Sequence, residues 1–375
     1  MKVTLVGPIY PYRGGIAHHT AMLHRAMVAR GHQVSLYSFR RQYPRWLFPG
    51  RTDRDPSALK LDAECEYMLD SLNPLTWWAT ARAIRAQQPD ALILQWWVPF
   101  FAPMWMMLAQ AARRAGIRVM FICHNVLPHE QRPWDIWLAR SALGLGGGFI
   151  VHSQEERARL LALLPGRRVE VSPHPIYDMF ASHVISRDQA RRRLELPTTA
   201  PVLLFFGLVR EYKGLRYLLE AMPAIRVGCP DVRLLVVGEF WENKQVYLNQ
   251  IVRLGIERNV IVVDRYVPNE ETPLYFSAAD VAVLPYTQVT QSGVVQLAFG
   301  FGVPIITTRM GGLAEVVSDG DTGLLVPPGD PAALALAVTR YFREGSRERM
   351  AQAIEQARPR FDWQNLVMLI EEMAQ

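Results

Sequence analysis

The chain has 375 residues, which exceeds the size at which one hydrophobic core stops growing, so we expect two domains of about 150 to 200 residues. Half of the residues are hydrophobic and 20% are charged, as in globular proteins, while three scattered cysteines exclude a disulfide framework and favour a reducing, cytoplasmic setting. The 41 basic and 35 acidic residues leave a formal charge of +6, which favours anionic partners such as phosphates, lipid headgroups or nucleic acid.

The first half of the chain alternates short aliphatic runs with helix-like segments. The apolar runs predict strands at residues 1–7, 32–39, 90–96, 117–125 and 147–153. Helices are expected over about 17–30, up to residue 115, and between the last two strands. The most apolar region, residues 91–108, is about as long as a membrane span, but Gln95, Pro99 and Pro103 interrupt it. We interpret it as a buried strand followed by an aromatic loop.

The strand–helix pattern stops near Val171, where two prolines and no clear period indicate a link, and it restarts after a helix-like segment at 185–196. Strands are predicted at residues 201–208, 231–239, 259–267, 280–286 and 303–308, with a closing helix from Pro331. The sequence therefore predicts an α/β protein with two parallel-sheet, Rossmann-like domains. We expect these domains to face each other across a ligand-binding cleft.

Glycines and a histidine follow two strands of the first half. Gly14 and Gly15 come directly after the first strand, where they let the backbone approach a ligand, although a plain loop explains them equally well and G-x-G-x-x-G is absent. His124 ends the strand at 117–125, where imidazole can donate to a sugar hydroxyl, although a structural role is the alternative. His129 and Glu130 nearby lack metal-site spacing.

Two cations precede the helix that follows the strand at 201–208. Arg210 and Lys213 are unfavourably placed for the helix dipole, so an anion held by both explains them, with a solvated turn as the alternative. Loops at Gly238–Glu239 and Tyr266–Val267 also follow strands and are placed to border a nucleotide. The spacing at Asp319 and Asp321 suits a metal-binding D-x-D motif, but the surrounding turn residues favour a plain turn, and we expect no metal or other cofactor.

The stretch QVTQSGVVQ links a buried strand to a helix rich in small and apolar residues. Helix-start N–H groups bind anions, and neutral amides and hydroxyls nearby can hold sugar hydroxyls. We predict that this stretch borders the ligand-binding cleft. Its candidate binding residues are Gln288, Gln291, Ser292, Gly293, Val294 and Gln296.

Three segments give the chain a resemblance to glycosyltransferase family 4: GGIAHHTAMLHRAMVARGHQVSLYS, FFGLVREYKGL and GVPIITTRMGGLAEVVSDGDTGLLVPPGDPAALA. The resemblance implies the glycosyltransferase-B fold and retaining transfer of a sugar from a nucleotide-diphosphate donor to a hydroxyl without an essential metal. It also implies that Arg210 and Lys213 stabilise the diphosphate, His124 contacts the donor sugar, Gly14–Gly15 close over the donor and Tyr266 receives the base. The resemblance further implies that the final helix crosses back to the N-terminal domain. We therefore expect an acceptor domain of residues 1–178 and 360–375 and a donor domain of residues 179–359.

The sequence departs from the family where two glutamates eight positions apart are usual. Gln288 and Gln296 have this separation, but counting back from Pro304 places the second family position at Leu297. A glutamine keeps an acceptor oxygen and loses the charge. Three interpretations remain open. The protein is an active enzyme of a divergent branch, a binding or partner subunit without turnover, or another nucleotide-sugar enzyme such as an epimerase or phosphorylase. Nucleic-acid binding is not expected, because the basic residues form no recognised module.

Residues 39–54 hold arginines at 40, 41, 45, 51 and 54, interleaved with Tyr43, Trp46 and Phe48. Basic residues mixed with aromatics suit an anionic membrane interface or a lipid-diphosphate acceptor. The sequence therefore predicts a glycan or lipid-linked acceptor and peripheral contact with the inner face of the cytoplasmic membrane. It does not encode the sugar, the nucleotide, the linkage or the oligomeric state.

Overall fold

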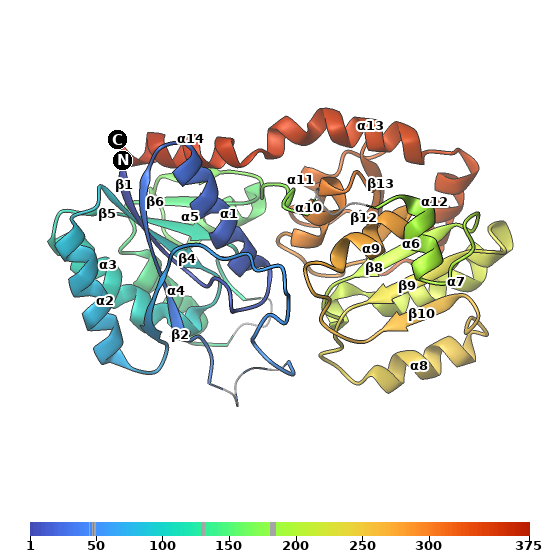
Figure 1. Cartoon of the computed structure of the whole chain (residues 1–375), viewed down its shortest axis with the longest axis horizontal. Coiled ribbons are helices and arrows are strands. Elements are labelled where there is room, and N and C mark those ends of the chain that lie inside the picture. Colours follow the sequence, from blue (N-terminus) through green and yellow to red (C-terminus); the bar gives the residue numbers. More distant parts are fainter. Residues whose placement is uncertain (45, 47, 49, 129–131, 181–184) are drawn as a thin grey trace. The chain divides into compact units, whose positions relative to one another are not determined.

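The computed structural model describes residues 1–44, 46, 48, 50–128, 132–180 and 185–375, which form two compact units (Figure 1). The first unit comprises Met1–Pro56, Lys60–Pro173 and Asp362–Gln375, and the second comprises Ser57–Leu59 and His174–Phe361. The chain therefore leaves the first unit after Pro173 and returns to it for the last helix.

The first unit is built on a parallel sheet of seven strands in the order β3-β2-β1-β4-β5-β6-β7. Its strands are β1 (Lys2–Val6), β2 (Gln33–Arg41), β3 (Glu66–Asp70), β4 (Ala91–Trp96), β5 (Arg118–Cys123), β6 (Gly148–Val151) and β7 (Val169–Val171). Sequence reasoning found β1, β2, β4, β5 and β6 but not the two edge strands, β3 and β7. Both edge strands are short and lack a continuous apolar run, because an edge strand is less completely buried.

Helices connect these strands and cover the sheet. They are α1 (Gly15–Ala29), α2 (Pro74–Gln87), α3 (Ala102–Arg114), α4 (Asp135–Leu143), α5 (Gln154–Leu163) and the C-terminal α14 (Trp363–Ala374). Side-chain caps begin three of them: Asn73 accepts from the Leu75 N–H, Ser153 from the Glu156 N–H and Asp362 from the Gln364 N–H. The caps satisfy amide donors that the helices leave unpaired.

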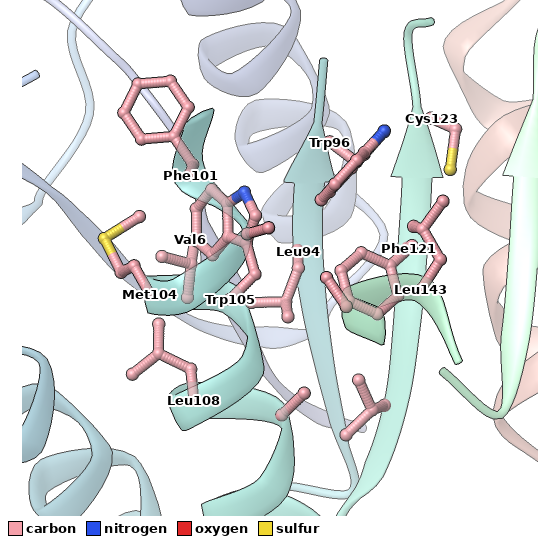
Figure 2. Packing of buried hydrophobic residues seen from close by; sticks show 14 of the residues in the cluster. Val6, Leu94, Trp96, Phe101, Met104, Trp105, Leu108, Phe121, Cys123 and Leu143 are labelled. Atoms are coloured by element: carbon pink, nitrogen blue, oxygen red, sulfur yellow. The ribbon is translucent and has the colours of Figure 1, made fainter. Parts of the chain in front are cut away.

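The apolar region at 91–108 forms β4, a 3₁₀ turn η1 (Pro99–Phe101) and the start of α3. The expectation of an aromatic loop was therefore wrong from Ala102 onward, because a proline in the first turn of a helix loses no intrahelical hydrogen bond. Phe101, Met104, Trp105 and Leu108 of this segment pack with β4 and β5 side chains in the core (Figure 2). Among the described residues, no helix is long and apolar enough to cross a membrane.

Helix α14 packs on α1 and places the C-terminus beside the N-terminus in the first unit (Figure 1). Leu366, Val367 and Ile370 are fully buried. Glu371 accepts two hydrogen bonds from Arg30, at 2.7 and 2.8 Å, and lies 2.8 Å from His32 Nε2. The last helix is thus part of the first unit's core and not an appendage.

The second unit contains a parallel sheet of six strands in the order β10-β9-β8-β11-β12-β13. Its strands are β8 (Val202–Phe206), β9 (Arg233–Val237), β10 (Val260–Val263), β11 (Val281–Leu284), β12 (Ile305–Thr308) and β13 (Gly323–Val326). Its helices are α6 (Arg187–Arg193), α7 (Leu215–Gly228), α8 (Lys244–Arg253), α9 (Thr272–Ala278), α10 (Gly293–Gly300), α11 (Leu313–Val316), α12 (Pro331–Arg343) and α13 (Arg347–Ala357), with 3₁₀ turns η3 (Glu211–Lys213) and η4 (Arg358–Phe361). Strand β13 was missed because turn residues surround its four-residue apolar run.

The two parallel sheets with connecting helices confirm the predicted α/β fold class. In both sheets, the strand that begins the unit lies in the interior, and the chain winds outward from it in both directions. Reversal of the winding direction leaves an opening at the carboxyl ends of neighbouring strands, where α/β proteins bind ligands. In the second unit this position lies between β8 and β11, which carry the loops with Arg210, Lys213 and the glutamines.

Candidate active site

The two predicted cations lie on a short turn between β8 and α7. Arg210 is extended and precedes η3, and Lys213 closes this turn with its N–H bonded to the Arg210 carbonyl at 2.9 Å. The Lys213 ammonium stands 5.3 Å from the centre of the Tyr286 ring, and the Arg210 guanidinium stands 5.7 Å from the Trp241 ring. Desolvation by burial lowers the pKa of Lys213, and the neighbouring Arg210 charge lowers it further while Tyr212 raises it.

Glycines allow three segments to converge on Lys213. A Cβ atom placed on Gly207 would lie 3.2 Å from Lys213 Nζ and 3.3 Å from Val294 Cγ2. Gly238 is packed so closely that a Cβ atom there would lie 1.9 Å from the Gly207 carbonyl oxygen. The ends of β8 and β9, the lysine and the start of α10 therefore meet at one place, and the structure brings together predicted residues from three loops.

The lysine turn is also fixed from the other side by the loop after β11. Gly214 has φ +70°, and a Cβ atom there would lie 1.9 Å from the Pro285 carbonyl oxygen. The Thr287 N–H donates to the Tyr212 carbonyl at 2.7 Å, and the Thr287 hydroxyl donates to the same oxygen at 3.2 Å. Lys213 is thus held in place by backbone packing, which suits a charge that must meet a ligand without reorganising.

Helix α10 begins beside this lysine. Ser292 is its N-cap, and no described side chain caps the helix or places a carboxylate in the first turn. The Ser292 hydroxyl instead lies 3.4 Å from the hydroxyl of buried Tyr286, and desolvation raises the pKa of Tyr286 to about 12. The amides of Gly293 and Val294, the positive end of the helix dipole and Lys213 together suit a phosphate group.

The glutamines of this stretch do not form a single row. Gln288 is exposed, Gln291 is partly buried, and Gln296 lies in the second turn of α10 with only 2% of its surface exposed. Among the described residues, none bonds the buried Oε1 of Gln296. An orphaned buried acceptor costs about 1–3 kcal/mol, so Gln296 has a physical reason to meet a donor such as a sugar hydroxyl.

The other two predicted loops of the second unit occupy neighbouring strand ends. Gly238 and the buried Glu239 follow β9, and the partly buried Tyr266 and buried Val267 follow β10. The carboxylate of Asp264 accepts from the Phe240 N–H at 3.1 Å and from Lys244 at 3.0 Å, and so joins the two loops. Because β9 pairs with both β8 and β10, these loops border the lysine turn on one side.

In the first unit, the predicted residues follow β1 and β5. Gly14 caps α1, which has no described acidic residue in its first turn. The buried His124 bonds through Nε2 to Gln95 Oε1 at 2.6 Å, and its ring meets that of His19 at 4.7 Å and that of His152 at 5.2 Å. Burial lowers the pKa of His152 to about 4, so the imidazole of His152 is neutral near pH 7. Sequence reasoning missed Gln95, His19 and His152. Polar side chains within largely apolar segments were the available signal of a buried polar cluster.

The D-x-D spacing at Asp319 belongs to a turn. Asp319 pairs with Arg309 at 2.7 Å and accepts from the Leu325 N–H at 2.9 Å, which fixes the start of β13. Across the described parts of the chain, no group of three or more His, Cys, Asp or Glu side chains is arranged to hold a metal ion. Trp241 and Tyr286, which flank the cations, were also missed, because aromatic residues after buried strands are common in cores.

Family models match both halves of the chain. Residues 13–178 match the model described as Glycosyltransferase Family 4, and residues 200–344 match the model described as Glycosyl transferases group 1. The chain belongs to the family 4-type glycosyltransferases. This confirms the resemblance on which the expected fold depended, and the two matches cover the lysine turn, α10 and the glycine loop before α1.

Curated relatives and solved structures agree with this family assignment. The chain is 30% identical over 224 residues to a D-inositol 3-phosphate glycosyltransferase of Corynebacterium urealyticum, covering 58% of this chain and 51% of that protein. It is 33% identical over 213 residues to the Nocardioides sp. protein of that name, covering 53% and 46%. The chain thus spans about half the length of the curated relatives it matches.

Two solved structures share the fold over nearly the whole chain. Sucrose-phosphate synthase from Thermosynechococcus elongatus matches with a TM-score of 0.75 and 19% identity, covering 99% of this chain and 98% of that one. The Anabaena protein HepE, solved with UDP-glucose, matches with the same score and identity and covers the same shares. At this level of identity the likeness confirms the fold alone.

Proposed function

We propose that the protein transfers a sugar from a nucleotide-diphosphate sugar to a hydroxyl of a glycan or lipid-linked acceptor, with retention of configuration. The observation that carries this proposal is the convergence of Lys213 Nζ, Gly207 and the first turn of α10, with Arg210 on the same turn as the lysine. Two cations and a helix start form a site for a departing diphosphate. The HepE structure, solved with UDP-glucose, has the same fold.

The proposed chemistry needs cations and geometry more than a protein carboxylate. The bond between the sugar and the diphosphate oxygen breaks, the acceptor hydroxyl oxygen forms the new glycosidic bond on the same face, and its proton passes to the leaving phosphate. Lys213 and Arg210 stabilise the negative charge that develops on this phosphate. Gln296 Oε1, buried without a described partner, accepts from a hydroxyl of the donor. We propose that no metal takes part.

The test is a screen of UDP-, GDP- and ADP-sugars by thermal shift, with turnover followed for every donor that binds. Lys213→Ala and Arg210→Ala are each expected to reduce transfer by about 100-fold or more, because each removes a charge that acts on the leaving group. Arg226→Ala, at the other end of α7, is the matched control. Wild-type transfer in both site variants contradicts the proposal.

A second candidate is a binding or partner subunit that has kept the fold and lost turnover. The different burial of Gln288, which is exposed, and Gln296, which is buried, favours it, because two glutamates are usual in the family and neither glutamine carries their charge. Gln288→Glu and Gln296→Glu, made separately, distinguish the two candidates. An active enzyme is impaired by at least one of them, whereas a wild-type chain that binds a nucleotide sugar but never turns it over is a binding subunit.

We also propose that the first unit contacts the cytoplasmic face of an anionic membrane. Trp46 is 80% exposed, Leu75 is 76% exposed and Trp78 is 59% exposed, and they lie in segments that follow the neighbouring strands β2 and β3. Exposed tryptophans beside arginines suit a lipid interface. Arg45 of the segment 39–54 lies outside the described residues. Co-sedimentation with phosphatidylglycerol vesicles at low salt is expected for wild type and reduced for Leu75→Ser/Trp78→Ser. A wild-type chain that stays in the supernatant contradicts this part.

A further inference from the structure

Two aromatic rings lie beside the Arg210 guanidinium in the second unit. The guanidinium carbon stands 5.4 Å from the centre of the Tyr212 ring and 5.7 Å from the centre of the Trp241 ring. Both distances are within the range of about 6 Å over which an aromatic ring attracts a cation. Tyr212 belongs to the same short turn as Arg210, whereas Trp241 reaches the arginine from the loop after β9. The contact with Trp241 therefore joins two strand-end loops that were predicted to meet a ligand.

Backbone hydrogen bonds hold the Trp241 loop in register against the arginine. The Val209 N–H donates to the Glu239 carbonyl at 2.9 Å, and the Trp241 N–H donates to the Val209 carbonyl at 3.1 Å. These bonds continue the parallel pairing of β8 and β9 past the ends of both strands. Val209 is fully buried and directly precedes Arg210, so the backbone of Trp241 is fixed next to the backbone of the arginine.

A second set of contacts braces the same loop against α8 and the loop after β10. The Phe240 N–H donates to Asp264 Oδ1 at 3.1 Å, and the Phe240 ring meets the Tyr247 ring of α8 at 5.6 Å. Lys244 pairs with the other carboxylate oxygen of Asp264 at 3.0 Å. A ring on a backbone that is held from both sides offers a fixed surface to its neighbour.

Arg210 needs such a surface because its charge acts on the neighbouring Lys213. Desolvation by burial lowers the pKa of Lys213, and the charge of Arg210 lowers it further, so the two cations repel each other. An arginine side chain also has a long, flexible stem, which loses conformational freedom when a ligand fixes it. A ring that attracts the guanidinium opposes both effects before any anion is present.

We propose that Trp241 is a positioning residue that holds the Arg210 guanidinium in place for the departing diphosphate, an inference that rests on the proposed function. A guanidinium carries its N–H donors at the edge of its plane, so a ring against its face leaves them available for paired hydrogen bonds with phosphate oxygens. Lys213 stands 5.3 Å from the Tyr286 ring, so each cation has an aromatic neighbour from another loop. Trp241 acts through Arg210 and needs no contact with the reacting atoms.

The experiment is a double-mutant cycle on the full chain, read by calorimetric titration with inorganic pyrophosphate and with UDP. Pyrophosphate presents the diphosphate without a sugar or a base. The four proteins of the cycle are wild type, Trp241→Leu, Arg210→Ala and the variant with both substitutions. Trp134→Leu is the matched control, because its ring stands 5.8 Å from the Arg132 guanidinium in the first unit. Trp241→Met takes the place of Trp241→Leu if the latter fails to fold, and Trp241→Phe keeps an aromatic ring.

We expect Trp241→Leu to weaken pyrophosphate binding by about tenfold, which is within the range of a cation–π contact. In the Arg210→Ala background the same substitution is expected to change binding by less than about twofold, because the ring has lost the group through which it acts. Trp241→Phe is expected to bind within about threefold of wild type, and Trp134→Leu within about twofold.

Three results overturn the proposal. An equal loss in both backgrounds means that the ring supports the loop and not the arginine. A loss in Trp241→Phe as large as that in Trp241→Leu means that the face of the ring plays no part. Unchanged pyrophosphate binding with weaker UDP binding assigns the ring to the nucleobase.

Transfer from nucleotide sugars is measured on the same proteins. If no donor is turned over while pyrophosphate binding depends on Trp241 only when Arg210 is present, the proposed function fails and the positioning role stands. If Arg210→Ala impairs transfer while Trp241→Leu acts equally in both backgrounds, the positioning role alone fails. Wild-type protein that binds neither pyrophosphate nor UDP overturns both.

Discussion

Lys213 shows how single residues define this site. Its ammonium lies beside Gly207, where a side chain would leave it no room, and its backbone is hydrogen-bonded into a short turn. Gln296 and the imidazole cluster around His124 are buried polar groups of a different kind, because they lie inside the units and away from water. Such groups are functional or structural according to the partner that satisfies them.

His152 predicts a pH dependence at the residue scale. Burial lowers its pKa to about 4 from an ordinary value of 6.5, so between these values the unfolded chain binds a proton that the folded chain does not. Its contribution to stability is complete above pH 6.5 and is lost as pH falls toward 4, by about 3 kcal/mol. Urea unfolding at pH 7.0 and 4.5 measures this loss. His152→Gln is expected to reduce the difference, and identical pH slopes in the two proteins contradict the assignment.

At the scale of elements, the site depends on close contacts between strand ends and helix starts. Gly214 lets α7 begin directly against the carbonyl of Pro285, and α10 begins where β8 and β9 end. Alternating strands and helices predict that these loops share one edge of a sheet. The sequence does not predict which atoms touch, because backbone contacts of this kind depend on the order of the strands.

Gly214→Ala tests this contact. The substitution places a side chain at φ +70° and 1.9 Å from a backbone oxygen, so we expect a loss of about 3 kcal/mol or more and reduced donor binding. Gly255→Ala, at φ +62° with no atom within 4 Å of the new Cβ, is expected to cost about 1 kcal/mol. Urea unfolding compares the two. Equal losses mean that the contact with Pro285 relaxes and contributes nothing.

A second element-scale prediction concerns Ser57–Leu59, which belong to the second unit. The N–H groups of Ala58 and Leu59 donate to the two carboxylate oxygens of Glu270 at 3.0 and 3.3 Å. Glu270→Ala is expected to speed hydrogen exchange at both amides by at least tenfold, because no acceptor replaces the carboxylate. Glu271→Ala, which removes a carboxylate paired with Arg265, is the control. Unchanged exchange at Ala58 and Leu59 contradicts the role of Glu270.

At the scale of the whole molecule, the chain crosses between its units and returns. The last helix completes the first unit, although nearly 190 residues of the second unit separate it from the rest in sequence. Its amphipathic face packs on α1 through apolar side chains and ion pairs. The first unit is therefore incomplete until α14 has been made.

Leu366→Ala tests the place of this helix. Leu366 is fully buried, so we expect a loss of about 2–5 kcal/mol, with faster hydrogen exchange in α1 and unchanged exchange in α7. Met368→Ala, at a side chain that is 45% exposed on the same helix, is expected to change stability by less than about 0.5 kcal/mol. Faster exchange in α7 and not in α1 contradicts the assignment of α14 to the first unit.

The sequence by itself determined the fold class and predicted which strand-end loops form the candidate site, because continuous apolar runs and turn residues are local signals of buried parallel strands. It predicted Arg210 and Lys213 as an anion site from their unfavourable place before a helix. Only the tertiary structure decided that Lys213, Gly207 and Val294 meet, that Gln296 is buried while Gln288 is exposed, and that the Trp241 ring lies beside the Arg210 guanidinium. These facts depend on strand order and side-chain packing across segments distant in sequence, which no local pattern encodes.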